Sequence, residues 1–260
     1  MLTRRLIVCL DVDGGQVVKG THFVDLRPLG TPAAMAEAYE RQGADEIVFL
    51  DISASIERRP TLLAEVRQTA SRLAIPLTVG GGVRTVDDIA NTLRAGADKV
   101  AMNTAAVERP ELITRAAERF GAQCVVVSID ARRHESGWRV MTHGARSVTP
   151  FDAVAWAERC VALGAGELLV TSIDRDGTRS GYDTALIRTV ADRVGVPVIA
   201  SGGAGTPEHL LQALTDGRAD AVLVAGVLHD GTYTVQSLKA HLQTAGILVR
   251  AAERTEGVYA

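Results

Sequence analysis

The stretch Gly43-Ala44-Asp45-Glu46-Ile47-Val48 returns in altered form as Gly164-Ala165-Gly166-Glu167-Leu168-Leu169, 121 positions later (164 minus 43). Each copy has a glycine typical of a helix end, followed by the start of an apolar run. Self-similarity at a fixed separation indicates a repeated structural unit. We therefore expect the chain to consist of two similar halves.

Three further matches extend this repeat. Residues 75–82 correspond to 196–203 at the same separation, and residues 97–100 correspond to 219–222 at a separation one residue longer. Val8-Cys9-Leu10-Asp11 corresponds to Val127-Ser128-Ile129-Asp130. The sequence thus predicts one domain over residues 1–250, with halves at about 1–122 and 123–250. Residues 251–260 lack periodicity and are predicted to form a disordered C-terminal tail.

Apolar runs alternate with amphipathic stretches, four of each in either half. Strands are expected at Leu6–Leu10, Ile47–Leu50, Leu77–Val79, Val100–Met102, Cys124–Ile129, Leu168–Thr171, Val198–Ala200 and Ala221–Val224. Helices are expected at Pro32–Gln42, Thr61–Leu73, Val86–Ala95, Pro110–Phe120, Asp152–Leu163, Asp183–Arg193, Pro207–Leu214 and Val235–Thr244. Nearly continuous apolar strands are typical of a parallel sheet buried on both faces. An open doubly wound sheet has no reason to repeat in this way, so we predict an α/β fold, a (β/α)₈ TIM barrel made of two half-barrels.

Composition and charge narrow the classes of partner. The formal net charge is −3, which gives no reason to expect nucleic acid or an anionic membrane. Cys9, Cys124 and Cys160 are widely spaced in apolar runs and are interpreted as buried free thiols, so we expect a cytoplasmic protein. The six histidines show no ligand spacing, and the glycine motifs of dinucleotide and Walker-type sites are absent from the sequence. Neither a metal nor an organic cofactor is expected.

Acidic and small polar residues end several predicted strands, where such barrels carry their active sites. The repeat places Asp11 and Asp130 at the ends of the first and fifth strands, on opposite sides of the mouth. Two such carboxylates can work as acid and base on two sides of one substrate, although each could merely cap its loop. Asp51, Thr171 and Ser201 end other strands and are assigned to substrate contact.

Glycine clusters follow the third and seventh strands, at Gly80-Gly81-Gly82 and Gly202-Gly203. Each precedes a predicted helix, whose first N–H groups can hold an anion. Asn103-Thr104 and Ala225-Gly226 follow the next strand in each half. The duplicated arrangement predicts a ligand with two phosphate groups, unless the glycines serve only tight turns.

Four charged residues stand at strand starts on the opposite face: Arg5, Glu46, Lys99 and Glu167. Each side chain is expected to point either into the bottom of the barrel or out to solvent. In the first case they would form an ion-pair ring that closes the barrel.

Several motifs, taken in order, resemble the cyclase subunits of imidazole glycerol phosphate synthase, a family of histidine biosynthesis. The resemblance covers residues 5–250, and its most specific pieces are Cys9-Leu10-Asp11-Val12, Val18-Lys19-Gly20, residues 49–55, Gly80-Gly81-Gly82, residues 100–107, residues 171–178, Gly181-Tyr182-Asp183 and residues 200–205. The chain departs from the family's usual pattern at Arg27–Pro32, at Thr149-Pro150, at Arg218, and at Ala225-Gly226 in place of alanine–serine.

The resemblance implies a reaction: ammonia converts the bisphosphate phosphoribulosyl formimino-AICAR phosphate to imidazole glycerol phosphate and AICAR ribotide. It implies that Asp11 and Asp130 are the acid–base pair and that Lys19 and Asp176 close over the substrate on loops. It further implies one phosphate site at Gly82, Asn103 and Thr104, and a second at Gly177, Gly203, Ala225 and Gly226.

The resemblance also implies a glutaminase partner in a heterodimer, which delivers ammonia through the gate of Arg5, Glu46, Lys99 and Glu167. Two alternatives stay open. One is the related isomerase of the same pathway, which shares the repeat and the aspartate pair. The other is a barrel that binds a phosphate ligand without catalysis.

Overall fold

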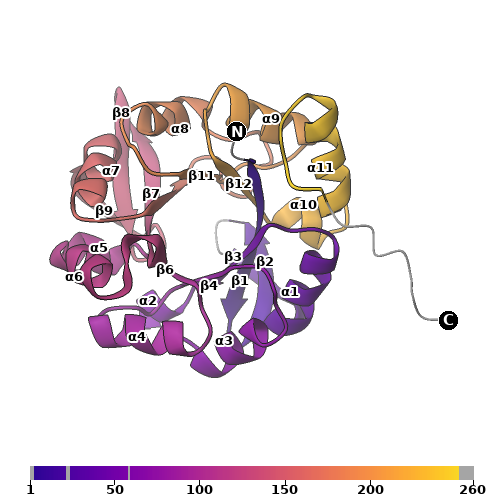
Figure 1. Cartoon of the computed structure of the whole chain (residues 1–260). Coiled ribbons are helices and arrows are strands. Elements are labelled where there is room, and N and C mark those ends of the chain that lie inside the picture. The colour runs from indigo at the N-terminus through magenta and orange to yellow at the C-terminus, as the bar shows by residue number, and fades with distance from the viewer. Residues whose placement is uncertain (1–2, 22–23, 58, 252–260) are drawn as a thin grey trace.

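A closed ring of parallel strands forms the centre of the molecule, surrounded by helices, in the computed structural model (Figure 1), which describes residues 3–21, 24–57 and 59–251. Apart from Ala251, the tail predicted at residues 251–260 lies outside the described residues. The barrel strands are β1 (Arg5–Asp13), β4 (Glu46–Asp51), β5 (Leu77–Gly80), β6 (Lys99–Met102), β7 (Val125–His134), β10 (Glu167–Ser172), β11 (Val198–Ser201) and β12 (Ala221–Val224).

Parallel pairing closes these strands into a barrel. The order runs β1-β4-β5-β6-β7-β10-β11-β12, and β12 pairs with β1. The predicted (β/α)₈ barrel and its eight strands are confirmed. The division into half-barrels stays a prediction from the repeat.

The outer layer consists of the helices α1 (Pro32–Arg41), α3 (Leu63–Ala70), α4 (Val86–Arg94), α6 (Glu111–Phe120), α7 (Ala153–Ala162), α8 (Thr184–Ala191), α9 (Pro207–Thr215) and α11 (Val235–Thr244). Each corresponds to a helix expected from the sequence. Shorter helical turns are α2 (Ala54–Glu57), α5 (Thr104–Glu108), η1 (Ala122–Cys124) and α10 (Gly226–His229). Of these, α5 and α10 directly follow β6 and β12, the last barrel strand of each sequence repeat.

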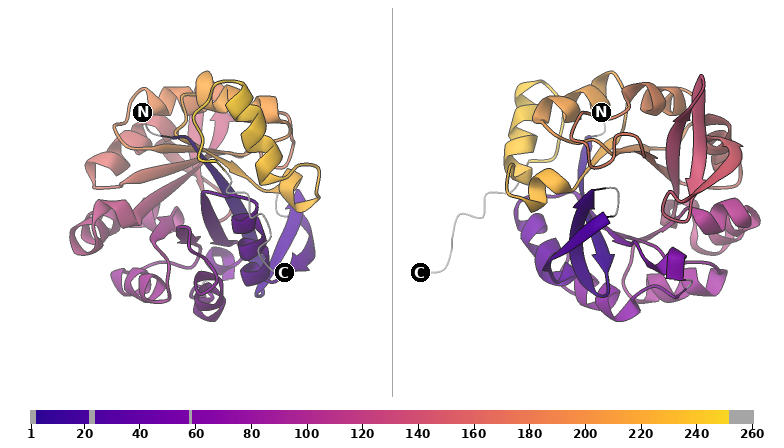
Figure 2. Two further views of the ribbon diagram at one scale, coloured as in Figure 1. Left: turned by 45° about the vertical axis from the view of Figure 1, so that its right-hand side comes forward. Right: turned by 180° about the vertical axis from the view of Figure 1, so that it is seen from behind.

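Two antiparallel hairpins extend from the carboxyl ends of β1 and β7, and Figure 2 (right) shows them on the same face of the barrel. They comprise β2 (Gln16–Thr21) with β3 (Val24–Gly30), and β8 (Gly137–Thr142) with β9 (Ser147–Asp152). Of the two hairpins, only the second has a strand-like alternation in its sequence, at Trp138–Thr142. In the first hairpin, register shifts at Val17/Val18 and Lys19/Thr21 disturb the period of two, so no strand signal remained.

Side chains on each barrel strand alternate between the barrel interior and the helix layer. Ile7, Cys9, Val48, Val126 and Leu169 belong to a small apolar cluster inside the barrel. Their neighbours, such as Leu6, Val8 and Ile47, pack into the larger core between strands and helices. This alternation decides which end-of-strand residues face the barrel axis.

Three aspartates at the amino-terminal face fix neighbouring strands together. The N–H groups of Leu6, Leu77 and Val198 donate to the carboxylates of Asp45, Asp98 and Asp220, at 2.8, 2.8 and 3.1 Å. Gly166 is the counterpart of Asp45 in the second half of the repeat. A side chain does not fit there, because a Cβ on Gly166 would lie 2.1 Å from the Ala122 carbonyl oxygen. There the Gly166 N–H donates to the Val125 carbonyl instead, at 3.0 Å.

We expect Asp45→Ala to lower the free energy of unfolding by about 3 kcal/mol, because it leaves the buried Lys239 ammonium without its counter-charge. In the native chain Lys239 Nζ lies 2.7 Å from Asp45 Oδ1, and both side chains are buried. Urea unfolding measures the change. Asp192→Ala, which removes an exposed pair with Arg218, is the control and should cost about 1 kcal/mol or less. Equal costs for the two variants would contradict the structural role of Asp45.

Candidate active site

Asp11 and Asp130 face the barrel interior from opposite walls. Asp11 lies an even number of residues from Ile7 and Cys9 on β1, and Asp130 lies an even number of residues from Val126 on β7. Both aspartates therefore share the inward-facing side of their strands. Three strands separate β1 from β7 in either direction around the ring. The predicted opposition of the two aspartates therefore agrees with the topology.

Burial governs the acidity of this pair. It raises the pKa of Asp11 to about 7, and the nearby charge of Asp176 adds to the effect, while a hydrogen bond from Cys9 Sγ at 3.6 Å opposes it. Burial likewise raises the pKa of Asp130 to about 7, opposed by a 2.7 Å hydrogen bond from Asn103 Nδ2 and assisted by Asp176. A carboxylate loses much of its hydration inside the barrel, which disfavours its charged form.

A pKa near 7 allows both protonation states at neutral pH. One of the two carboxyl groups can then accept a proton while the other donates one, on opposite sides of a molecule held between them. Asp176 affects the pKa of both groups and therefore lies within electrostatic reach of the whole mouth. Its loop connects β10 to α8.

Thr171 and Ser201 line the same wall as Asp130. Thr171 is paired in register with Asp130 on one side and with Ser201 on the other. Thr171 and Ser201 lie on the inward-facing sides of their strands, two residues after Leu169 and Ile199. Their expected position at the mouth is consistent with this register.

The first predicted phosphate site lies between the β5–α4 loop and the start of α5. Asn103 precedes α5, and its Nδ2 donates to Met141 O at 3.1 Å as well as to Asp130. Thr104 Oγ1 accepts a hydrogen bond from the His143 N–H at 3.0 Å. Asn103 Oδ1 is buried without a hydrogen-bond partner among the described residues. An acceptor of this kind would accept a hydrogen bond from a ligand hydroxyl or amino group.

The second predicted site lies where three loops converge. Gly203 adopts a φ of +106°, and a Cβ there would lie 2.2 Å from the Gly181 carbonyl oxygen, so only glycine fits. The Gly181 N–H donates to Gly203 O at 2.9 Å, which joins this turn to the loop that carries Gly177. Lys19 Nζ donates to Gly226 O at 3.2 Å, which places the hairpin lysine beside Ala225-Gly226.

Asp51 differs from its neighbours at the mouth. It lies on the same side of β4 as Ile47 and Phe49, which face the helix layer. Its buried carboxylate accepts two 2.6 Å hydrogen bonds from Arg59. These hydrogen bonds raise the pKa of Arg59, with a further contribution from Glu57. The geometry does not support the predicted direct substrate contact of Asp51. Its role here is to fix the β4–α3 loop through Arg59, a residue that the sequence analysis did not single out.

Arg5, Glu46, Lys99 and Glu167 form a ring of ion pairs at the amino-terminal end of the barrel. Arg5 Nη1 lies 2.9 Å from Glu46 Oε2, and its other amino group pairs with Glu167. Lys99 Nζ lies 2.9 Å from Glu46 and 2.8 Å from Glu167. Of the two orientations left open by the sequence, the structure shows the inward one.

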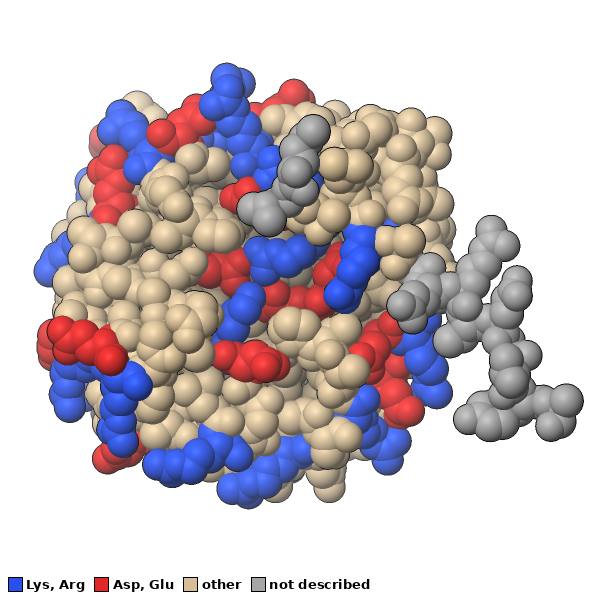
Figure 3. Space-filling view, viewed as in Figure 1, with Lys and Arg blue, Asp and Glu red and all other residues tan. Residues whose placement is uncertain are grey.

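Thr78 is a further member of this ring, which the sequence analysis missed. Its Oγ1 donates to Glu46 Oε1 at 2.5 Å, and the threonine is buried. Glu46 is itself almost fully buried, whereas Arg5 retains about a quarter of its side-chain exposure. Figure 3 shows charged side chains of both signs gathered at the centre of this face, in the view of Figure 1.

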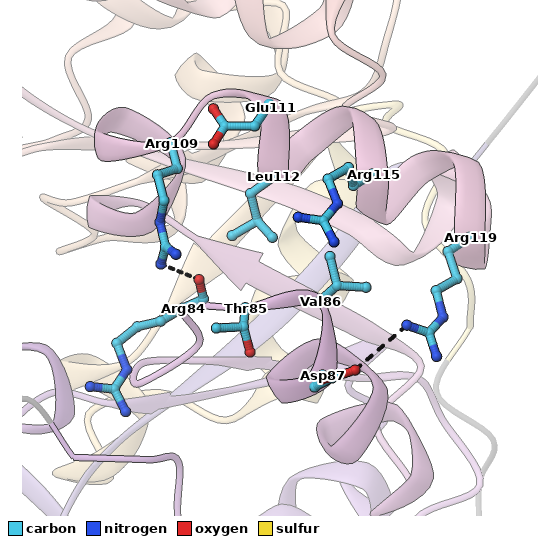
Figure 4. Close-up of a pocket in the computed structure, with 9 residues that line it drawn as sticks. All are labelled: Arg84, Thr85, Val86, Asp87, Arg109, Glu111, Leu112, Arg115 and Arg119. Atoms are coloured by element: carbon cyan, nitrogen blue, oxygen red, sulfur yellow. Dashed lines mark hydrogen bonds and ion pairs between the residues drawn. The ribbon is translucent and has the colours of Figure 1, made fainter.

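A surface cleft of about 290 Å³ lies between α4 and α6, outside the barrel mouth (Figure 4). Arg109 donates to the Arg84 carbonyl, and Arg119 lies 3.6 Å from Asp87. None of the predicted site residues lines this cleft. We therefore do not assign it to the active site.

The described residues contain no group of three or more His, Cys, Asp or Glu side chains that could hold a metal ion. Over the same residues, no helix is long and apolar enough to cross a membrane. The three cysteines are free thiols, but only Cys9 and Cys160 are buried. The expected burial of Cys124 is wrong, because Cys124 ends the surface turn η1 and remains partly exposed.

Comparison with known proteins identifies the family of this chain. The family model described as histidine biosynthesis protein matches residues 5–234. A relative from Myxococcus xanthus, the imidazole glycerol phosphate synthase subunit HisF, is 63% identical over 250 residues, covering 96% of this chain and 99% of the relative. The protein of the same name from Metallosphaera sedula is 57% identical over 250 residues, covering 96% of this chain and all of the relative.

We expect Asp176→Asn to lower the pKa of both Asp11 and Asp130, because it removes a negative charge that disfavours their ionised forms. Carbon-13 NMR titration of the side-chain carboxyl groups measures both values. Asp174→Asn, on the same loop, is the matched control, since Asp174 instead accepts a 2.7 Å hydrogen bond from the Arg133 N–H. A pKa near 7 for both groups in Asp176→Asn would show that burial alone sets their acidity.

Proposed function

Because the chain belongs to the family of histidine biosynthesis proteins, we propose that it is the cyclase subunit of an imidazole glycerol phosphate synthase. The substrate is phosphoribulosyl formimino-AICAR phosphate, which reacts with ammonia to give imidazole glycerol phosphate and AICAR ribotide. The observation that supports this reaction best is the pair of opposed aspartates, each with a pKa of about 7, between two glycine-containing loop regions.

The two loop regions orient the substrate. One phosphate binds at Gly82, Asn103 and Thr104, and the other at Gly177, Gly203, Ala225 and Gly226. Lys19 contributes a positive charge at the second site, where it already contacts Gly226. Glycine replaces the family's usual serine at position 226, so that residue offers its backbone but no hydroxyl group. The substrate is thereby extended across the mouth, with its reacting atoms between the aspartates.

Asp11 and Asp130 then move protons in opposite directions. The ammonia nitrogen loses its protons as it bonds to the ketone carbon and to the formimino carbon of the substrate, and the ribulosyl C1 carbon loses one as the ring becomes aromatic. The ketone oxygen leaves as water, and the AICAR nitrogen is protonated as its bond to the formimino carbon breaks, so these two groups take up the protons released. An ionised aspartate accepts protons on one side, and a protonated aspartate supplies them on the other. Asp176 helps to keep the pKa of both groups near 7 and contacts the substrate from its loop.

Ammonia reaches this site through the barrel. A glutaminase subunit docks on the amino-terminal face as a heterodimer partner and releases ammonia at the ring of Arg5, Glu46, Lys99 and Glu167. The path beyond the ring is lined by small or apolar inward side chains, including Val48, Ala101 and Val126. A neutral ammonia molecule crosses such a lining more readily than ammonium does. A cytoplasmic location stays a prediction from the free cysteines.

A turnover assay with the purified chain, the ribulosyl bisphosphate and ammonium at alkaline pH tests the reaction. We expect imidazole glycerol phosphate from the wild type. Asp11→Asn and Asp130→Asn should each reduce kcat by about 10²-fold or more, with little change in substrate affinity, because general acid–base catalysis contributes about that much. Wild-type turnover in either variant would refute the assigned role. Conversion of the aldose precursor instead would favour the isomerase.

Lys99→Ala tests the gate. We expect it to reduce glutamine-dependent activity with the glutaminase subunit more than ammonium-dependent activity, because Lys99 bridges both acids of the ring. The ratio of the two activities in one preparation is the measurement. Lys239 also pairs with an acid on this face, but outside the ring, so Lys239→Met is the comparison variant. An unchanged ratio in Lys99→Ala would argue against ammonia transfer through the ring.

A further inference from the structure

Asp230 joins two segments that carry proposed substrate contacts. It follows α10, and its Oδ2 lies 3.0 Å from Lys19 Nζ in the β2–β3 hairpin. The same oxygen pairs with Arg179, in the loop between β10 and α8. That loop also contains Asp176 and Gly177. A single carboxylate thus holds cations from the two segments that are proposed to close over the substrate, and Figure 2 (right) shows the hairpin on this face.

The second oxygen of Asp230 fixes the orientation of the carboxylate. Oδ1 accepts hydrogen bonds from the Thr232 N–H at 3.0 Å and from Thr232 Oγ1 at 2.6 Å. Burial by itself would raise the pKa of Asp230, but the hydrogen bonds from Thr232, Lys19 and Arg179 outweigh it and hold the pKa well below the usual range. Asp230 is therefore ionised throughout the physiological range.

His229 anchors the same segment to β1. Its Nε2 lies 3.0 Å from the Cys9 carbonyl oxygen, and its Nδ1 lies 2.7 Å from Tyr39 Oη. A carbonyl can only accept, so Nε2 carries the hydrogen and Nδ1 accepts from the tyrosine hydroxyl. Burial lowers the pKa of His229 to about 4, which keeps the ring neutral. The hydrogen bonds of His229 thus fix the backbone from which the Asp230 side chain extends.

A comparable but weaker contact occurs on the opposite side of the barrel mouth, beside α5. His143 lies in the turn between β8 and β9, and its N–H donates to Thr104 Oγ1 at the start of α5. Its Nε2 lies 3.6 Å from the carboxylate of Glu108, at the end of α5. Lys19 makes the equivalent contacts with Gly226 and Asp230, at the start and just past the end of α10. The contact at Asp230 differs in having a permanent cation, Lys19, and an additional arginine, Arg179.

We propose that Asp230 is a latch that pre-positions Lys19 and Arg179 beside the second phosphate site and gives up Lys19 to the substrate's phosphate. Its ligand rests on the proposed function, whereas the latch itself is a property of the free protein. Lys19, Asp230 and Arg179 all keep between a quarter and a half of their side-chain exposure. Exposed ion pairs are individually weak. A phosphate dianion can therefore take the lysine without a large opposing cost, while Arg179 remains with Asp230.

Amide hydrogen exchange on the ligand-free full-length chain tests the latch. In Asp230→Asn we expect residues 16–21 and 174–181 to exchange at least about threefold faster than in the wild type, because both segments lose an attachment. Exchange in β4 and β5 should not change. Asp192→Asn, which neutralises an aspartate of similar exposure paired with Arg218 and Arg188, is the control and should match the wild type. Wild-type exchange of both segments in Asp230→Asn would overturn the proposal.

Arg179→Gln gives a second test that keeps Asp230 in place. It should accelerate exchange of residues 174–181 alone. Adding Asp230→Asn to it should then accelerate residues 16–21 but have little further effect on 174–181, because residues that share one contact are not additive. Full additivity in 174–181 would contradict a shared latch, even if Asp230→Asn alone loosens the whole fold.

Steady-state kinetics with the ribulosyl bisphosphate and ammonium test the positioning role. Asp230→Asn should raise KM by about fivefold and change kcat by less than about twofold, because the cost of ordering Lys19 shifts to the binding step. An unchanged KM would overturn the positioning role. If the wild type fails to turn over this substrate, the proposed function is wrong, whereas faster exchange in Asp230→Asn would still establish the latch.

Discussion

Strand alternation in a closed parallel barrel is the constraint on which the other features of this molecule depend. Every second side chain faces the axis, so Arg5, Ile7, Cys9 and Asp11 form one line along β1. The line begins at the ion-pair ring, passes the apolar interior and ends at a carboxylate. The same sequence of environments runs along β10, from Glu167 through Leu169 to Thr171. Ring, interior and mouth are consequently three levels of one set of inward positions.

The three levels impose different electrostatics on otherwise ordinary residues. At the ring, two acids and two bases neutralise one another, and Thr78 supplies an additional donor to the most buried acid. At the mouth, burial raises the pKa of both Asp11 and Asp130 to about 7, and the charge of Asp176 adds to both shifts. Asp51 is a carboxylate at the end of a neighbouring strand, but it lies on the side that faces the helix layer, where Arg59 pairs with it. The side of the strand on which an aspartate lies therefore decides whether it is a proposed proton-transfer group or part of a structural ion pair.

Much of this arrangement could be predicted from the sequence. The repeat predicted the barrel and the opposition of Asp11 to Asp130, because both follow from strand order and parity. The ring followed from charges at strand starts once their parity was known. The Asp51–Arg59 pair could not be predicted, because it depends on how the β4–α3 loop folds back. The first hairpin was missed because bulges disrupt its alternation, and Asp230 because its partners come from two distant loops.

The proposed interior path from ring to aspartates can be tested most directly by isotope labelling. The chain would be assayed with its glutaminase subunit, glutamine labelled with nitrogen-15 in the amide group, and an excess of unlabelled ammonium below the pH at which free ammonia reacts appreciably. If ammonia passes through the barrel, the imidazole ring of the product carries nitrogen-15 with little dilution. A label diluted to the ratio in bulk solution would mean that ammonia reaches Asp11 and Asp130 from the open mouth, and that the inward line of side chains is not its route.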